Sequence, residues 1–87
     1  MNRILVVDDA PVNLQVLVDS LEPAGHEVLT ASDGETALQL CTRVRPDLIL
    51  LDVVMSGLDG ISVCRRLKAM PAVADVPVIF ITGLADW

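Results

Sequence analysis

The stretch RILVVDD, residues 3–9, decides the fold, because a short apolar run ends abruptly in two adjacent aspartates. A second apolar run, residues 48–51, ends in Asp52. Short apolar runs bounded by polar residues are typical of strands buried on both faces of a parallel sheet. In an open α/β sheet the ligand crevice lies beyond the carboxyl ends of the strands. We therefore expect Asp8, Asp9 and Asp52 to meet there, a pattern that favours a divalent cation and an anionic group.

Helical and strand patterns alternate along the chain. Pro11 suits the first position of a helix that ends at Pro23 and Gly25, and Asp33 (or Ser32) and Asp59 suit the caps of two more helices. We predict strands at 3–7, 26–31, 48–51 and 78–81, and helices from 11, after 33 and at 61–70. Each helix has an expected inner face of apolar residues. These residues are Leu14, Leu17, Val18 and Leu21 in the first helix, Ala37, Leu38, Cys41 and Val44 in the second, and Ile61, Cys64 and Leu67 in the third. Such alternation predicts a doubly wound parallel sheet with helices on both faces.

Length and composition narrow the class of protein. The chain has 87 residues, enough for one small domain. No apolar run approaches the ~20 residues of a membrane span, and Asp8 interrupts the first run too early for a signal peptide. We therefore expect a cytoplasmic protein without a membrane partner. A net charge of −6 disfavours direct binding to nucleic acid.

Each acid also has a plainer interpretation. Asp8 or Asp9 alone could cap the first helix, and Asp52 alone could form a turn at a strand end. Thr82, which follows the fourth apolar run, could likewise be an ordinary strand-end hydroxyl. Polar groups of this kind at the ends of three strands favour a shared site over coincidence.

Five segments together resemble the receiver domain of bacterial response regulators. They are VVDD at 6–9, DGETAL at 33–38, RPDLILLD at 45–52, LLDVVMSGLDG at 50–60 and IFITG at 79–83. The resemblance covers the whole chain, and the combination is far more specific than any single segment. It implies a flavodoxin-like fold with strand order 2-1-3-4 over the residues present.

The resemblance also implies a reaction. Asp52 would accept a phosphoryl group from a phosphohistidine on a sensor histidine kinase or phosphotransfer protein. Asp9 would hold Mg²⁺ directly and Asp8 through water. The other implied contacts are the Val54 carbonyl to the metal, and the Thr82 hydroxyl and the Gly83 amide to the phosphoryl group. The domain would catalyse only this transfer to its own aspartate, so it would not be classed as an enzyme.

The physics fits these roles. Three neighbouring carboxylates repel one another, and a cation relieves that repulsion. Mg²⁺ prefers hard oxygen ligands and keeps several waters, which suits a few carboxylates and a phosphoryl group. A carboxylate that attacks phosphorus needs charge neutralised on both reactants.

The sequence also departs from the family pattern. The only lysine, Lys68, is at the wrong place for the family's phosphate-pairing lysine, while Ser56 replaces a usual proline and Gly83 a usual alanine. The usual fourth helix, fifth strand and fifth helix would follow Trp87. We therefore expect residues 1–87 to be a single, truncated receiver domain with an impaired switch. Residues 78–81 would form an exposed sheet edge and cause self-association.

Two other functions remain open. One is a non-catalytic interaction or dimerisation module that keeps the receiver fold; the missing lysine supports it and the three acids oppose it. The other is a phosphotransfer enzyme with an aspartyl nucleophile on a related fold. The second is disfavoured, because no general acid or suitably placed lysine is visible and the chain is short.

Overall fold

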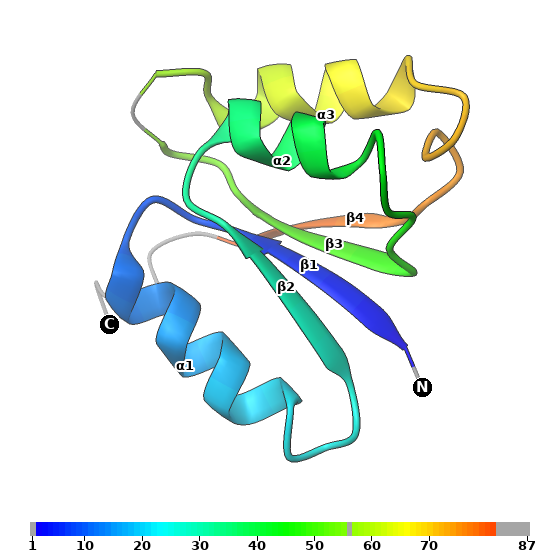
Figure 1. The fold of residues 1–87 in the computed structure, drawn as a ribbon. Coiled ribbons are helices and arrows are strands. Elements are labelled where there is room, and N and C mark those ends of the chain that lie inside the picture. Colours follow the sequence, from blue (N-terminus) through cyan, green and yellow to red (C-terminus); the bar gives the residue numbers. More distant parts are fainter. Residues whose placement is uncertain (1, 56, 82–87) are drawn as a thin grey trace.

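Over the described residues, the fold is a four-stranded sheet with helices on both faces (Figure 1). A computed structural model describes residues 2–55 and 57–81. The elements are β1 (Arg3–Val7), α1 (Pro11–Leu21), β2 (Glu27–Ala31), α2 (Gly34–Leu40), β3 (Leu48–Asp52), α3 (Gly60–Lys68) and β4 (Val78–Ile81). The strands are parallel in the order β2-β1-β3-β4. This confirms the predicted flavodoxin-like order 2-1-3-4.

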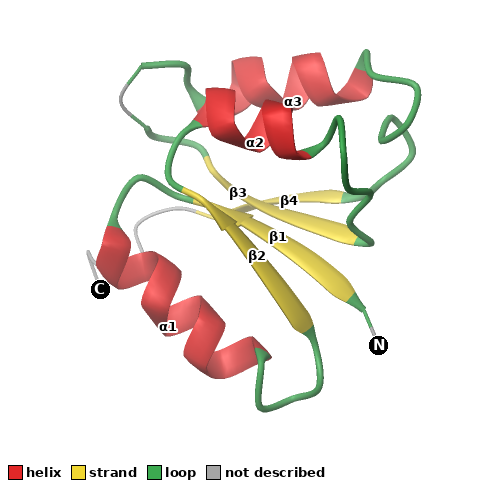
Figure 2. Cartoon of the chain, viewed as in Figure 1, coloured by secondary structure: helices red, strands yellow, loops and turns green. Residues whose placement is uncertain are grey.

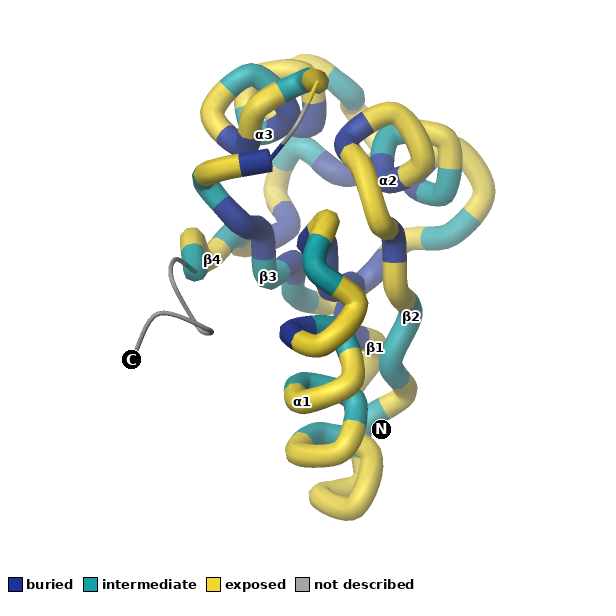
Figure 3. Tube along the Cα trace, turned by 90° about the vertical axis from the view of Figure 1, so that its left-hand side faces the viewer, coloured by how far each residue is buried: buried dark blue, intermediate teal, exposed yellow. Residues whose placement is uncertain are grey.

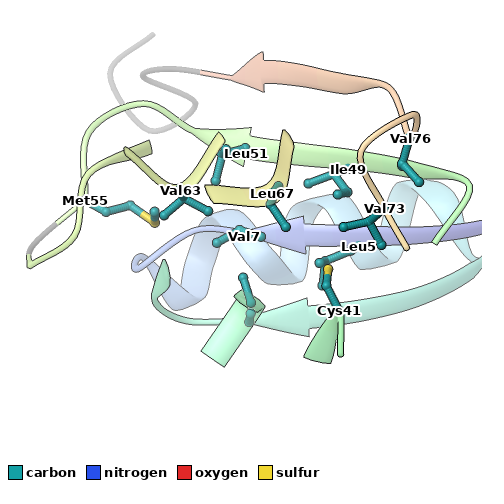
Figure 4. Close-up of a cluster of buried hydrophobic side chains, with 12 residues drawn as sticks. Leu5, Val7, Cys41, Ile49, Leu51, Met55, Val63, Leu67, Val73 and Val76 are labelled. Atoms are coloured by element: carbon teal, nitrogen blue, oxygen red, sulfur yellow. The ribbon is translucent and has the colours of Figure 1, made fainter. Parts of the chain in front are cut away.

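The helices divide unequally between the two faces of the sheet. α1 lies on one face, and α2 and α3 lie together on the other (Figure 2). The main core fills the space between the sheet and α2 and α3, where Figure 4 shows side chains of β1 and β3 meeting Val63 and Leu67 of α3. Within residues 2–55 and 57–81, every helix is too short or too polar to span a bilayer.

The register of the two central strands fixes where their polar ends lie. Val7 of β1 pairs with Leu51 of β3, so the residues that follow, Asp8 and Asp52, extend from the sheet at the same level. Val7 and Leu51 are fully buried. The hydrophobic register that buries them therefore brings the two carboxylates to the same edge of the sheet.

Two helices are capped as the sequence predicted. The Asp33 carboxylate accepts a hydrogen bond from Thr36 N at 2.7 Å at the start of α2. The Asp59 carboxylate accepts one from Ser62 N at 2.8 Å at the start of α3. These bonds satisfy donors that the first helical turn leaves free.

Two predicted helix faces are corrected. Ile61 is 43% exposed, and the buried positions of α3 are Gly60, Val63 and Leu67. Because α3 begins at Gly60, packed against β3, Ile61 lies about 100° around the helix from that contact. Val44 was predicted on the inner face of α2, but this helix ends at Leu40.

The predicted inner face of α1 is also less buried than expected. Leu14, Leu17, Val18 and Leu21 are only half-buried. Figure 3 shows α1 exposed along most of its length. The physical reason is that, among the helices of the described residues, α1 is the only one on its face of the sheet, whereas α2 and α3 shield each other on the opposite face.

Candidate functional site

Three carboxylates meet at the carboxyl edge of the sheet. Asp8 and Asp9 follow β1, and Asp52 is the last residue of β3. One carboxylate oxygen from each of the three lies within 4.8 Å of those of the other two. Asp8 and Asp52 are buried, while Asp9 is exposed. The predicted meeting of Asp9 and Asp52 is therefore confirmed.

Asp8 is held by three hydrogen bonds. Its main-chain N–H donates to the Ala31 carbonyl of β2 at 3.1 Å. Its Oδ1 accepts from the N–H of Ala10 at 2.9 Å, and its Oδ2 accepts from Asn13 Nδ2 at 3.0 Å. Only 1% of Asp8 is exposed. The hydrogen bonds offset the cost of burying this carboxylate and fix its orientation.

Asp52 is anchored by the loop that follows β3. The Val54 N–H donates to Asp52 Oδ1 at 3.1 Å. The loop closes where the Gly60 N–H donates to the Val53 carbonyl at 3.1 Å. The start of α3 thereby sits directly behind the end of β3, which fixes the main chain of Asp52.

The surroundings of Asp52 disfavour its charge. Burial raises the pKa of the Asp52 carboxyl above its ordinary value, the Val54 N–H opposes this rise, and repulsion from Asp8 and Asp9 adds to it. A cation placed among the three groups would reverse this balance, since it favours the ionised form of each carboxylate.

The donor set fits Mg²⁺. Octahedral Mg²⁺ has oxygen ligands at about 2.1 Å, which places opposite ligands about 4.2 Å apart. Adjacent ligands lie about 3.0 Å apart, so the three carboxylate oxygens, which lie within 4.8 Å of one another, would draw together by at most about 2 Å to share one ion. All three ligands are hard oxygens, and the exposure of Asp9 leaves an open side for water and substrate.

The other predicted site residues have different outcomes. Val54 lies at the site through its N–H, and its carbonyl as a metal ligand stays a prediction. Thr82 and Gly83 lie outside the described residues. The sequence argument missed Asn13 and Gly60. Asn13 had a visible signal, because it is a polar residue four positions before Leu17 on the same helical stripe.

The sequence profile of the response regulator receiver domain matches residues 4–86. The chain is 51% identical over 82 residues to the response regulator PleD of Caulobacter vibrioides. That alignment covers 94% of the chain and 18% of PleD, so the chain spans a small part of this relative.

Solved structures of response regulators have the same fold as this chain. The chain has a TM-score of 0.88 and 35% identity to the response regulator TrrA of Thermotoga maritima in complex with Mg²⁺-BeF, over 99% of this chain and 73% of that one. It also has a TM-score of 0.86 and 36% identity to a chain in the complex of the histidine kinase ThkA with TrrA. This alignment covers 95% of this chain and 70% of that one. This protein belongs to the family of response regulator receiver domains, the phosphoacceptor modules of two-component systems, as its sequence motifs indicated.

Proposed function

We propose that Asp52 is the residue that accepts the phosphoryl group and that Asp8, Asp9 and Asp52 hold Mg²⁺. The observation that carries the proposal is the gathering of these three carboxylates within 4.8 Å at one edge of the sheet. Asp52 is the candidate nucleophile because it ends β3 and is anchored through Oδ1. Asp8, by contrast, accepts a hydrogen bond on each of its two oxygens.

The transfer is a substitution at phosphorus. An oxygen of Asp52 forms the new O–P bond while the P–N bond of a phosphohistidine breaks, and the imidazole nitrogen keeps the electron pair. Asp8, Asp9 and Asp52 would hold Mg²⁺, whose positive charge would screen the attacking carboxylate and the phosphoryl oxygens from each other. The Val54 N–H holds Asp52 Oδ1, which orients the carboxylate before the attack.

Three further contacts belong to the proposal. The Val54 carbonyl would be a further ligand of the metal. The Thr82 hydroxyl and the Gly83 amide would donate to phosphoryl oxygens, because both follow β4, which lies beside β3. Transfer to Asp52 would be the chain's own catalysis, with a histidine kinase or phosphotransfer protein as donor.

Two structures of one relative, TrrA, support these assignments. Mg²⁺ and beryllofluoride, which has the shape and charge of a phosphoryl group, are bound in a TrrA structure. A histidine kinase accompanies TrrA in another.

The decisive experiment compares the phosphorylation of two variants, each with one aspartate replaced, Asp52 or the nearby Asp59. The chain is incubated with a small phosphoryl donor such as acetyl phosphate and Mg²⁺, and the intact mass is measured. Wild type should gain one phosphoryl group and Asp52→Asn should not. Asp59→Asn is the matched control, because it removes the same charge and keeps a side chain that caps α3. Equal labelling of Asp52→Asn and wild type would overturn the assignment.

A competing function, an interaction or dimerisation module, is favoured by one feature. In the part of the chain that the structure describes, β4 pairs on one side only, with β3, and Ile79 and Phe80 are exposed. We propose that this edge recruits a second copy of the domain. We also propose that residues 1–87 act as one domain around a single core. Sedimentation at micromolar concentration tests self-association, and a stable monomer would refute it.

A further inference from the structure

Asn13 occupies an unusual position in α1. Of the residues of α1, all of which are described, Asn13 alone is buried, with 8% of its surface exposed. The surrounding stripe of this helix consists of leucines and a valine that are only half-buried. A polar side chain at the deepest position costs free energy unless it is hydrogen-bonded. Packing alone would therefore favour an apolar residue at position 13.

The hydrogen-bond partner of Asn13 explains why a polar residue stands at this buried position. Asn13 Nδ2 donates to Asp8 Oδ2 at 3.0 Å. The amide nitrogen must face Asp8, because the amide oxygen would repel an ionised carboxylate. The bond joins the first turn of α1 to the residue that follows β1. It holds Asp8 Oδ2, whereas the Ala10 N–H holds Asp8 Oδ1.

The charge of the donor also matters. A lysine or arginine at this place would hold Asp8 as well, but its positive charge would oppose a cation in the same cluster. The neutral amide orients the carboxylate and leaves the negative charge of the cluster in place. Residues that hydrogen-bond to metal ligands in this way set the orientation and basicity of the ligand.

We propose that Asn13 is a positioning residue for the metal site: it fixes the Asp8 carboxylate in the orientation that Mg²⁺ binding requires. The inference rests on the proposed function, because it assumes that the three carboxylates bind Mg²⁺. It predicts that loss of the amide donor weakens Mg²⁺ binding even where the fold is intact.

The experiment uses two substitutions and a control on the same helix. Asn13→Ala removes the donor, and Asn13→Leu removes it while filling the space with a residue that suits the apolar stripe of α1. Gln15→Ala is the control, because Gln15 is an exposed amide whose side chain bonds Asp19 and not the site. Mg²⁺ affinity is measured by following backbone amide resonances during titration with MgCl₂. Unfolding in urea, with EDTA and with Mg²⁺, is measured in parallel.

Both Asn13 variants should bind Mg²⁺ about 10- to 100-fold more weakly than wild type, while Gln15→Ala should match wild type. A purely structural role would lower stability in EDTA and leave the added stabilisation by Mg²⁺ unchanged. The inference alone is overturned if either Asn13 variant keeps wild-type affinity, or if Gln15→Ala is weakened equally. If wild type binds no Mg²⁺, the proposed function and the inference both fall.

Discussion

The main chains of Gly60 and Asp52 touch. A Cβ atom at position 60 would lie 2.1 Å from the Asp52 carbonyl oxygen and 2.8 Å from the Cα of Val53. Both are backbone atoms, so no side chain could rotate to make room. Because the contact joins the start of α3 to the end of β3, the position of the helix and that of the candidate nucleophile are coupled.

Substitution of Gly60 should therefore disturb both stability and the site. Gly60→Ala should destabilise the fold by about 1–3 kcal/mol, since the methyl group forces the backbones apart. Mg²⁺ affinity should fall as well. Gly57→Ala is the control: Gly57 has φ +76° and open space around it, so only backbone strain of about 1 kcal/mol is expected. Urea unfolding and Mg²⁺ titration measure the two effects, and a Gly60→Ala protein with wild-type values would contradict the coupling.

Asp52→Asn should stabilise the metal-free protein. Burial, together with repulsion from Asp8 and Asp9, raises the pKa of Asp52 in the folded state. The folded protein therefore holds this proton more tightly than the unfolded chain. Its contribution to stability is present below the ordinary aspartate pKa of about 3.9 and is lost as pH rises through the raised value. Above that window Asp52→Asn should gain about 1 kcal/mol.

Urea unfolding in EDTA from acidic to neutral pH measures this gain. Asp59→Asn should show none, because the Ser62 N–H lowers the pKa of Asp59 and its charged form is favoured by folding. A loss of stability in Asp52→Asn at neutral pH would show that repulsion within the cluster is unimportant.

Mg²⁺ should stabilise the fold increasingly as its concentration rises above its dissociation constant. At one hundred times its dissociation constant the expected gain is about 2.7 kcal/mol, and EDTA should reverse it. Asp9→Asn should reduce the gain, because it removes one of the three carboxylates. Asp19→Asn, on the exposed side of α1, should leave it unchanged. Thermal unfolding with and without Mg²⁺ gives both comparisons, and equal gains in the two variants would argue against the site.

The core beneath Asp52 should be sensitive to truncation. Leu51 is fully buried and directly precedes the candidate nucleophile. Leu51→Ala should cost about 2–5 kcal/mol, because it removes buried methyl groups and leaves a cavity. Val16→Ala should change stability by under ~0.5 kcal/mol, since Val16 is 51% exposed. Equilibrium unfolding in urea distinguishes the two, and a small cost at Leu51 would mean that the core relaxes readily.

The β4 edge should respond to charge. Ile79 is 51% exposed, so Ile79→Lys should suppress self-association without a large loss of stability. Val12→Lys, at a position 70% exposed on α1, adds the same charge away from the edge and should not suppress it. Sedimentation at several protein concentrations measures both, and an equal effect of the two variants would remove β4 from the interface.

Local patterns made much of the fold predictable. The runs that end at Val7 and Leu51 are too short for helices and apolar throughout, which only strands buried on both faces require. Asp33 and Asp59 were recognisable as caps, because capping depends on residues within one turn. The faces of α1 and α3 were less predictable, since burial there depends on which neighbours cover each helix.

The sequence by itself determined the order of strands and helices, and it placed an acid after β1 and at the end of β3. It also contained the motifs that mark the family. Only the tertiary structure decided which other groups hold these acids: α1 brings Asn13 against Asp8, and the start of α3 brings Gly60 against the main chain of Asp52. The physical reason is that the alternation of apolar strands and polar ends is local, whereas the docking of a helix depends on packing between segments distant in the chain.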